Sequence, residues 1–254
     1  MILDGRSVLV TAGAGGAGLV IAREFAKAGG KVAVCDIDAA AVRHAAGEGL
    51  LAVEADIARE ADVEAVFAAA EARHGPVEVL VNNVGIAGPT AAVEDVALAD
   101  WERTMAANLT SHFLCIRRAV PAMKARRQGA IINISSGSAK VGLPLRLPYV
   151  VSKGAVLSLT MSLARELGPD GIRINALLPG ALRGERIERV VRDKAAALGV
   201  DASDYERSML RYISLRTMVD PEDIAAMAVF LASDAGRRIS GQRIGVDGNV
   251  EWEE

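Results

Sequence analysis

The sequence predicts one doubly wound α/β domain, a parallel sheet of about seven strands with helices on both faces. Short, nearly continuous apolar runs alternate with helical periods along the chain, and such runs are typical of parallel strands that helices cover on both sides. No linker, repeat or composition shift divides the 254 residues, of which 51% are hydrophobic. One large core is therefore expected over residues 1–254.

The individual elements follow in order. Apolar runs predict buried strands at 7–10, 31–35, 77–81 and 130–134. A helix face is predicted by apolar residues at i, i+3, i+4 and i+7, which are Val63, Val66, Phe67 and Ala70. The same spacing recurs near the C-terminus at Ile224, Met227, Ala228 and Leu231. Asp220 is the expected N-cap of that last helix, and Pro221 fits its first position.

Composition and charge exclude several classes of protein. The net charge is −3 without a cluster of like charges, so neither nucleic acid nor an acidic membrane surface is an expected partner. The N-terminus runs almost directly into a strand, and no apolar run approaches the length of a membrane span. Cys35 and Cys115, like His44, His74 and His112, lack ligand spacing. We expect a cytoplasmic protein with buried cysteines and no metal.

A glycine-rich segment, residues 11–18, follows the first strand and precedes a helix with Leu19, Ala22, Phe25 and Ala26. Glycines let the backbone approach a pyrophosphate, and the helix N-terminus offers unpaired N–H groups. The alternative is a turn that only packs the helix closely onto the sheet. The position of the glycine-rich segment between a strand and a helix favours phosphate binding.

Asp36 ends the second predicted strand, eighteen residues after Gly18. A carboxylate there can accept both ribose hydroxyls of an adenosine and repels a 2′-phosphate. The alternative is a helix cap for the segment after Ile37. Because no basic residue occupies the glycine loop or follows Asp36 directly, NAD is favoured over NADP.

Tyr149 and Lys153 are four residues apart, so on a helix they share one face. The ammonium favours the phenolate, which makes the tyrosine a usable proton-transfer group. Ser136, thirteen positions before Tyr149, offers a hydroxyl for the oxygen that gains or loses the proton.

Over essentially its whole length the chain resembles the short-chain dehydrogenase/reductase family, whose fold is of the Rossmann type. The glycine loop has Ala12 in place of the first glycine, and Asn82-Asn83-Val84-Gly85 has valine for alanine. Asp56-Ile57, Asn108, Ser136, Tyr149, Lys153, Pro179-Gly180 and the closing segment 241–248 match the remaining motifs in order.

The resemblance implies a catalytic tetrad, a dinucleotide site and a substrate lid at about 183–215. Tyr149 acts as general acid or base, Ser136 holds the substrate oxygen, Lys153 binds the nicotinamide ribose, and Asn108 orients a relay water. The expected NAD contacts are Thr11, Gly13, Gly15, Gly16, Ala17, Gly18, Asp36, Ile37, Asp56, Ile57, Asn82, Asn83, Gly85, Tyr149, Lys153, Pro179, Gly180 and Leu182. A homo-oligomer, with a tetramer favoured, is also implied, and Trp252 could anchor a subunit contact.

Two positions depart from the family pattern. At Ala12 a methyl stands where glycine allows a tight turn, and we expect Gly13 and Gly15 to absorb the strain. Gly184 stands where the family often has a threonine that contacts the nicotinamide carboxamide, so one hydroxyl is lost there.

The substrate is indicated by arginines. Arg183, Arg186, Arg189 and Arg192 recur every three residues in the lid, and Arg146 lies three residues before Tyr149. Arg146, Arg183 and Arg186, with Ser138, are candidate contacts to an anionic group. The alternative for the lid arginines is a solvated helix face, which the interleaved Glu185 and Glu188 favour.

The expected reaction is hydride transfer between NAD(H) and a small secondary alcohol or ketone, for which an anionic or a polyhydroxylated compound is the candidate. Two alternatives stay open. One is an NADPH-dependent ketoreductase of the same family, which Asp36 disfavours. The other is a non-catalytic dinucleotide-sensing or scaffold protein, in which a broken tetrad is expected.

Overall fold

The computed structural model describes residues 2–250, except the side chains of Glu185, Arg186, Asp193, Lys194 and Ala197. Seven strands form one parallel sheet in the order β3-β2-β1-β4-β5-β6-β7. The predicted doubly wound fold is therefore confirmed. The strands are β1 (Ser7–Thr11), β2 (Lys31–Asp36), β3 (Leu51–Glu54), β4 (Val79–Asn82), β5 (Gly129–Ile134), β6 (Ile172–Pro179) and β7 (Arg243–Val246).

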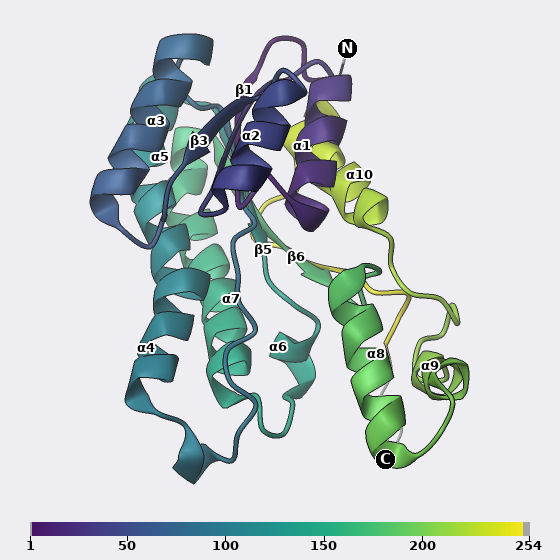
Figure 1. Cartoon of the computed structure of the whole chain (residues 1–254). Helices are drawn as coiled ribbons and strands as arrows, with labels where there is room; N and C mark the ends of the chain where they lie inside the picture. Colours follow the sequence, from purple (N-terminus) through teal and green to yellow (C-terminus); the bar gives the residue numbers. More distant parts are fainter. Residues whose placement is uncertain (1, 251–254) are drawn as a thin grey trace.

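Helices connect the strands and cover both faces of the sheet (Figure 1). Those of the doubly wound core are α1 (Gly16–Lys27), α2 (Ala39–Gly47), α3 (Glu60–His74), α4 (Leu98–Met105), α5 (Ser111–Arg126), α7 (Leu147–Leu167) and α10 (Pro221–Ala232). Three other helices lie beyond the carboxyl ends of the strands: the one-turn α6 (Ser138–Val141) and the longer α8 (Glu185–Leu198) and α9 (Ala202–Leu210).

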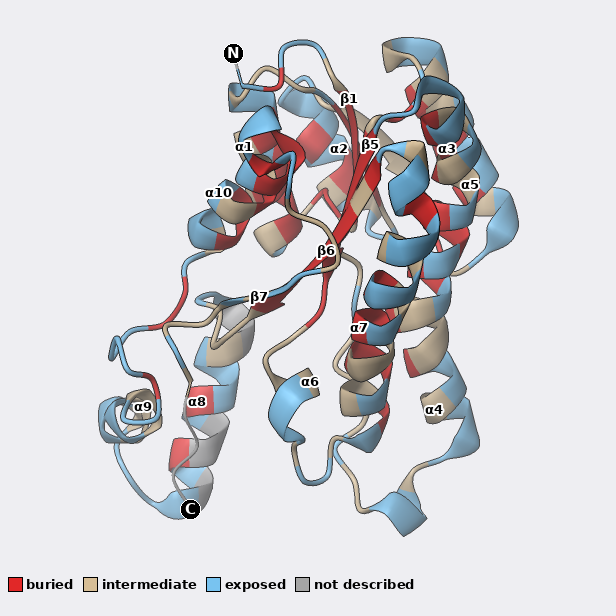
Figure 2. Cartoon of the chain, turned by 180° about the vertical axis from the view of Figure 1, so that it is seen from behind, coloured by how far each residue is buried: buried red, intermediate tan, exposed pale blue. Residues whose placement is uncertain are grey.

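Strand side chains alternate between two apolar layers, because successive residues of a strand point to opposite faces. Val8 and Val10 pack with α1, α2 and α10, whereas Leu9 packs with α3, α5 and α7. Both layers are buried at the centre of the molecule (Figure 2). This double burial is why the strands read as continuous apolar runs in the sequence.

The predicted helix faces are largely confirmed. Val63, Val66, Phe67 and Ala70 are all buried in α3. In α10, Asp220 is the N-cap and Pro221 the first helical residue, as expected. The helix expected after the glycine loop is α1, which contains Leu19, Ala22, Phe25 and Ala26; the first three are buried and Ala26 is exposed.

Both cysteines are buried and unbonded to each other, as expected. Burial raises the pKa of the Cys35 thiol to about 12 and also raises the pKa of Cys115. Both groups therefore stay protonated at neutral pH and act as small apolar side chains.

One stretch, Leu147–Asp170, is long and apolar enough to cross a membrane by length and composition alone. The expectation that no apolar run approaches that length is therefore wrong. In the fold this stretch is mostly α7, which packs against β6 and carries Tyr149 and Lys153. In the fold 33% of its most apolar window is buried, and the contact with the sheet accounts for that part.

Candidate active site

The carboxyl ends of β1, β2, β4, β5 and β6 bring the predicted site residues to one edge of the sheet. The first of these is the loop between β1 and α1, where α1 begins at Gly16 with Gly15 as its N-cap. Gly16 has open space where a Cβ would be, and Gly15 has only Ala41 at 3.8 Å. The first turn of α1 therefore presents N–H groups to a surface that an anion can approach.

Two other glycines of this loop are required for packing rather than for access. A Cβ on Gly18 would lie 2.0 Å from the Ala12 carbonyl oxygen, and one on Gly13 would lie 2.6 Å from the Val10 carbonyl oxygen. The sequence left close packing and phosphate access as alternatives. In the structure Gly13 and Gly18 serve close packing, and Gly15 and Gly16 leave access for a phosphate.

The strain at Ala12 is not absorbed where we expected. Ala12 itself adopts the left-handed conformation, with φ of 47°. Gly15 is extended, with φ of −145°. The left-handed conformation costs an alanine about 1–2 kcal/mol, so Ala12 itself carries the strain of this turn.

Asn83 clamps the loop from the end of β4. Its Nδ2 donates to the carbonyl oxygens of Thr11 (3.1 Å) and Ala12 (3.0 Å), while its N–H donates to Thr11 Oγ1 at 3.0 Å. The neighbouring Asn82 was expected to contact the cofactor, but it is fully buried and donates to Asn133 Oδ1. Asn82 thus ties β4 to β5, because its side chain turns into the sheet.

Asp36 lies at the end of β2, half-buried, and it accepts the Asp38 N–H at 3.2 Å. The cap of α2 is Asp38, whose carboxylate accepts from Ala40 and Ala41. The alternative in which Asp36 caps this helix is therefore wrong. Beyond it, Ile37 is 72% exposed, while Ile57 is buried beside the exposed Asp56.

Asn108 lies in a π-helical turn, Ala106–Thr110, between α4 and α5. Its Oδ1 accepts the Ile86 N–H at 2.7 Å, and its Nδ2 donates to the Ile86 carbonyl and to Ser152 Oγ, both at 3.0 Å. Ser152 Oγ in turn donates to the Tyr149 carbonyl at 2.8 Å. Such turns often occur at functional sites because they change which side chain faces inward.

Lys153 is buried against this group, and its Nζ donates to the Ile134 carbonyl at 2.9 Å. A Cβ on Gly85 would lie 2.9 Å from that Nζ and 3.5 Å from Asn108 Oδ1. Gly85 therefore has no room for a side chain, and its role is to let the lysine lie close to the backbone.

Ser136 follows β5, and its Oγ accepts from the hydroxyl of Ser138 at 2.9 Å and from the Ser138 N–H at 3.2 Å. Since both bonds are donated to Ser136, its own hydrogen remains directed elsewhere. Tyr149 stands in the first turn of α7, and the Arg146 guanidinium lies 5.3 Å from the centre of its ring. Arg146 Nη2 also donates to the Ala87 carbonyl at 2.9 Å.

His112 was not assigned to this site from the sequence. It is fully buried in α5, one turn after Asn108, with Nε2 3.3 Å from the Val84 carbonyl oxygen. Burial, followed by the charge of Lys153, lowers the pKa of His112 to about 3. The ring is therefore neutral at ordinary pH and donates from Nε2. Only its i+4 spacing from Asn108 could have indicated it.

The lid residues are placed differently from the expectation. Arg183 precedes α8, so it does not share a helix face with Arg189 and Arg192, and its Nε pairs with Asp220 at 2.8 Å on the surface. Arg189 and Arg192 are exposed in α8. Substrate binding by Arg183 is thus not supported, and the side chain of Arg186, like Trp252, lies outside the described residues.

The family contacts that follow β6 lie beside β7. Gly137 donates its N–H to the Pro179 carbonyl at 3.1 Å, and Gly180 donates to the Val246 carbonyl at 3.1 Å. Leu182 pairs with Val219 in an isolated bridge. Gly184 has φ of 146° and ψ of 173°, a conformation that is nearly confined to glycine.

Among the side chains that the structure describes, no three His, Cys, Asp or Glu residues are grouped so that they could hold a metal ion. Asp36 and the open first turn of α1 instead fit a dinucleotide, since one can accept ribose hydroxyls and the other can face a pyrophosphate.

Comparison with known proteins gives the family. A family model described as enoyl-(acyl carrier protein) reductase matches residues 12–250. The 2-(S)-hydroxypropyl-CoM dehydrogenase 3 of Xanthobacter autotrophicus is 33% identical over 255 residues, which cover 98% of this chain and 97% of the relative. An inactive 2-(S)-hydroxypropyl-CoM dehydrogenase 2 from the same organism is 39% identical over 234 residues, 91% and 99% of the two chains.

Solved structures agree with this result. An NAD⁺-bound xylitol dehydrogenase matches with a TM-score of 0.89 and 27% identity, over 98% of this chain and 100% of that one. An actinorhodin polyketide ketoreductase with NADPH matches with a TM-score of 0.89 and 30% identity, over 96% of both chains. The fold thus serves both nicotinamide cofactors. The chain belongs to the short-chain dehydrogenase/reductase family of oxidoreductases.

Proposed function

We propose that the chain is an NAD-dependent dehydrogenase that transfers hydride between NAD(H) and a small secondary alcohol or ketone. The observation that carries the proposal is the set of hydrogen bonds around the start of α7. Asn108 donates to Ser152, Ser152 donates to the Tyr149 carbonyl, and Lys153 donates to the Ile134 carbonyl. These bonds fix the first two turns of α7, and with them the tyrosine and the lysine.

In this proposal Tyr149 donates the proton when the ketone is reduced and accepts it when the alcohol is oxidised. Ser136 donates its hydrogen to the substrate oxygen, because both of its described hydrogen bonds are ones that it accepts from Ser138. Lys153 holds the nicotinamide ribose, and Asn108 orients a water that links the buried Lys153 to solvent.

NAD is proposed because of Asp36. Its carboxylate is not used as the cap of α2, so it is available to the ribose hydroxyls, and its charge opposes a 2′-phosphate. The first turn of α1, with Gly15, Gly16 and Ala17, would hold the pyrophosphate. When bound, the nicotinamide supplies the hydride carrier. An NADPH-dependent ketoreductase remains the second candidate, since a structural relative carries NADPH.

For the substrate we propose an anionic group, with a neutral polyhydroxylated alcohol as the alternative. The argument rests on Arg146, whose half-buried guanidinium lies against the Tyr149 ring and donates to the Ala87 carbonyl. Arg183 is already engaged with Asp220 on the surface. The arginine beside the reacting group is therefore better placed for a carboxylate, phosphate or sulfonate than the lid arginine.

The first experiment separates chemistry from binding. We expect Tyr149→Phe to lower kcat by about 10²–10⁴-fold, the usual contribution of a proton-transfer group, while NAD affinity stays within about twofold. If Tyr149→Phe turns over substrate at the unmodified rate, the mechanism is wrong. If the unmodified protein binds NAD but shows no turnover with a broad panel of alcohols, the result favours the non-catalytic alternative.

The second experiment tests the anionic substrate. The panel spans neutral polyols, sugars, hydroxy acids, and phosphorylated or sulfonated alcohols. Arg146→Gln should raise KM for an anionic alcohol by about tenfold or more, because a charge-assisted hydrogen bond is lost, and Arg189→Gln should not. Activity confined to neutral alcohols would discard the anionic assignment but retain the mechanism.

We further propose that the protein is a cytoplasmic homotetramer without membrane or nucleic-acid partners. Light scattering on a sizing column tests the assembly against the 26.5 kDa mass of one chain.

A further inference from the structure

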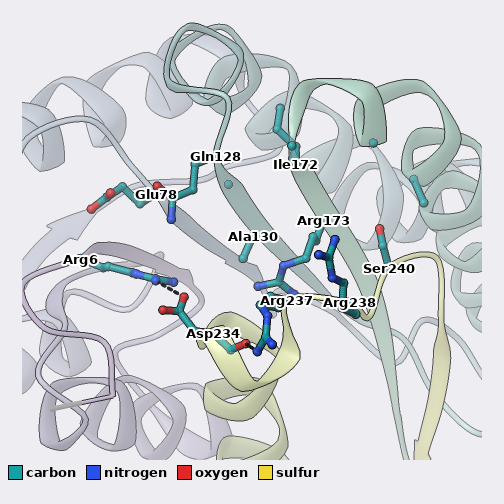
Figure 3. Close-up of a pocket in the computed structure, with 14 residues that line it drawn as sticks. Arg6, Glu78, Gln128, Ala130, Ile172, Arg173, Asp234, Arg237, Arg238 and Ser240 are labelled. Carbon is teal, nitrogen blue, oxygen red and sulfur yellow. Dashed lines mark hydrogen bonds and ion pairs between the residues drawn. The ribbon is translucent and has the colours of Figure 1, made fainter.

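A hollow lies at the opposite edge of the sheet from the candidate active site, where the strands begin (Figure 3). Its volume is about 350 Å³, and it is bordered by Gly129 and Ile172, the first residues of β5 and β6. This is the size of a site for a small ligand.

The charge around this hollow is predominantly positive. Four arginines line it, and they are Arg6, Arg173, Arg237 and Arg238. The two carboxylates in the lining are already used, since Asp234 pairs with Arg6 and Glu78 accepts the Ser7 N–H at 3.0 Å. Positive charge is therefore left in excess over the cavity.

Three of the guanidinium groups are held in place by backbone carbonyl oxygens. Arg6 Nη1 donates to Ala232 at 2.9 Å, Arg173 Nη1 to Gly236 at 3.0 Å, and Arg237 Nη1 to Asp234 at 3.1 Å. All three carbonyls belong to the end of α10 and the turn that follows it. Because the arginines are ordered in advance, a ligand would lose little of its binding energy in fixing them.

Arg173 and Arg6 also destabilise each other electrostatically. Burial, followed by the charge of Arg6, lowers the pKa of the Arg173 guanidinium, and the nearby Asp234 carboxylate offsets this only in part. An anion between them would offset both effects, since it supplies opposite charge where water is partly excluded.

We propose that this hollow is a second binding site, which takes the phosphate group of a small molecule. Guanidinium forks match the geometry of phosphate oxygens, and several converge here. Arg238 is exposed and makes no ion pair within the part of the chain that the structure describes, so it is available to close over the ligand. Ser240 accepts the Ile174 N–H at 3.2 Å, which leaves its hydrogen to donate.

The test is the binding of inorganic phosphate at constant ionic strength, measured by calorimetry and by the rise in Tm. Arg237→Gln/Arg238→Gln removes two exposed charges from the hollow and leaves Arg6 and Arg173 in place. Arg73→Gln/Arg211→Gln is the matched control, because it removes two exposed arginines elsewhere. The first turn of α1 also offers N–H groups to phosphate, so the comparison is made between variants that share this loop.

We expect the Arg237→Gln/Arg238→Gln variant to need at least about tenfold more phosphate for the same rise in Tm, and the control to match the unmodified protein. An equal response of the two double variants would overturn the proposed site. Succinate serves as a carboxylate probe, and a response to it as strong as that to phosphate would overturn the assignment to phosphate.

Discussion

Gly18 provides the sharpest test of the way in which α1 is packed onto the loop that precedes it. A methyl group on Gly18 would lie 2.0 Å from the Ala12 carbonyl oxygen and 2.7 Å from Asn83 Nδ2. A carbon and an oxygen normally remain more than 3.0 Å apart, so the helix or the loop must move by about 1 Å. Backbone cannot yield as a flexible side chain does, which places Gly18→Ala at the upper end of overpacking costs.

We expect Gly18→Ala to lower the free energy of unfolding by about 2–3 kcal/mol, and thus Tm by about 4–12 °C for a chain of this size. The measurement is thermal and denaturant unfolding without cofactor. Gly15→Ala is the control, because its methyl would meet only Ala41 at 3.8 Å and its backbone is extended. That variant should lose at most about 1 kcal/mol, because alanine is a poorer N-cap than glycine, and it should lose NAD affinity, since the methyl occupies the space proposed for the pyrophosphate. An unchanged Tm in Gly18→Ala would refute the packing argument.

Three further predictions test other parts of the molecule. Asp36→Ser should lower kcat/KM for NAD by about tenfold or more relative to NADP, whereas Asp38→Ser, which keeps a capping oxygen, should leave that ratio unchanged; equal ratios in both variants would contradict the assignment. The pKa of His112 is lowered to about 3 in the folded protein, whereas in the unfolded chain a histidine has a pKa of about 6.5. Below pH 6.5 the unfolded chain therefore binds a proton that the folded protein does not, and the free energy of unfolding falls as the pH falls from about 6.5 to about 3. At pH 5 the loss is about 2 kcal/mol. The His112→Gln variant should lack this part of the acid dependence when its free energy of unfolding is measured by denaturant titration. If the variant and the unmodified protein lose stability equally as the pH falls, the histidine is protonated in the folded protein. Gly184→Thr should lower the free energy of unfolding by about 1–3 kcal/mol because φ is 146°, and an unchanged midpoint would place the strain elsewhere.

Four strands were predictable from the sequence, namely β1, β2, β4 and β5, because they are buried on both faces and their apolar runs are nearly continuous. The edge strands β3 and β7 are partly exposed and show no such run. The glycine loop and Asp36 were placed correctly because strand ends fix their position in a parallel sheet. Local spacing is informative wherever backbone geometry alone decides which residues meet.

Contacts between distant segments were not predictable in the same way. Arg183 meets Asp220, thirty-seven residues away, so its apparent three-residue period with the lid arginines was misleading. Ala12 itself takes a left-handed conformation, although Gly13 and Gly15 were expected to absorb the strain, and Asn83 holds the Ala12 carbonyl from the end of β4. Asn82 faces Asn133 for a similar reason, since the side of a strand on which a residue lies depends on its register with the neighbouring strand.

The three hydrogen bonds of Asn108 have a consequence for recognising inactive relatives. They join the segment after β4 to α7, so the loss of this side chain would leave buried polar groups unpaired and weaken the fold. A descendant that abandoned hydride transfer would still be under selection to keep the asparagine for stability. Tyr149 differs, because among the described side chains only its backbone carbonyl, and not its hydroxyl, takes part in a hydrogen bond. In this branch of the family the tyrosine hydroxyl is therefore the better marker of catalysis, and the asparagine is a marker of architecture.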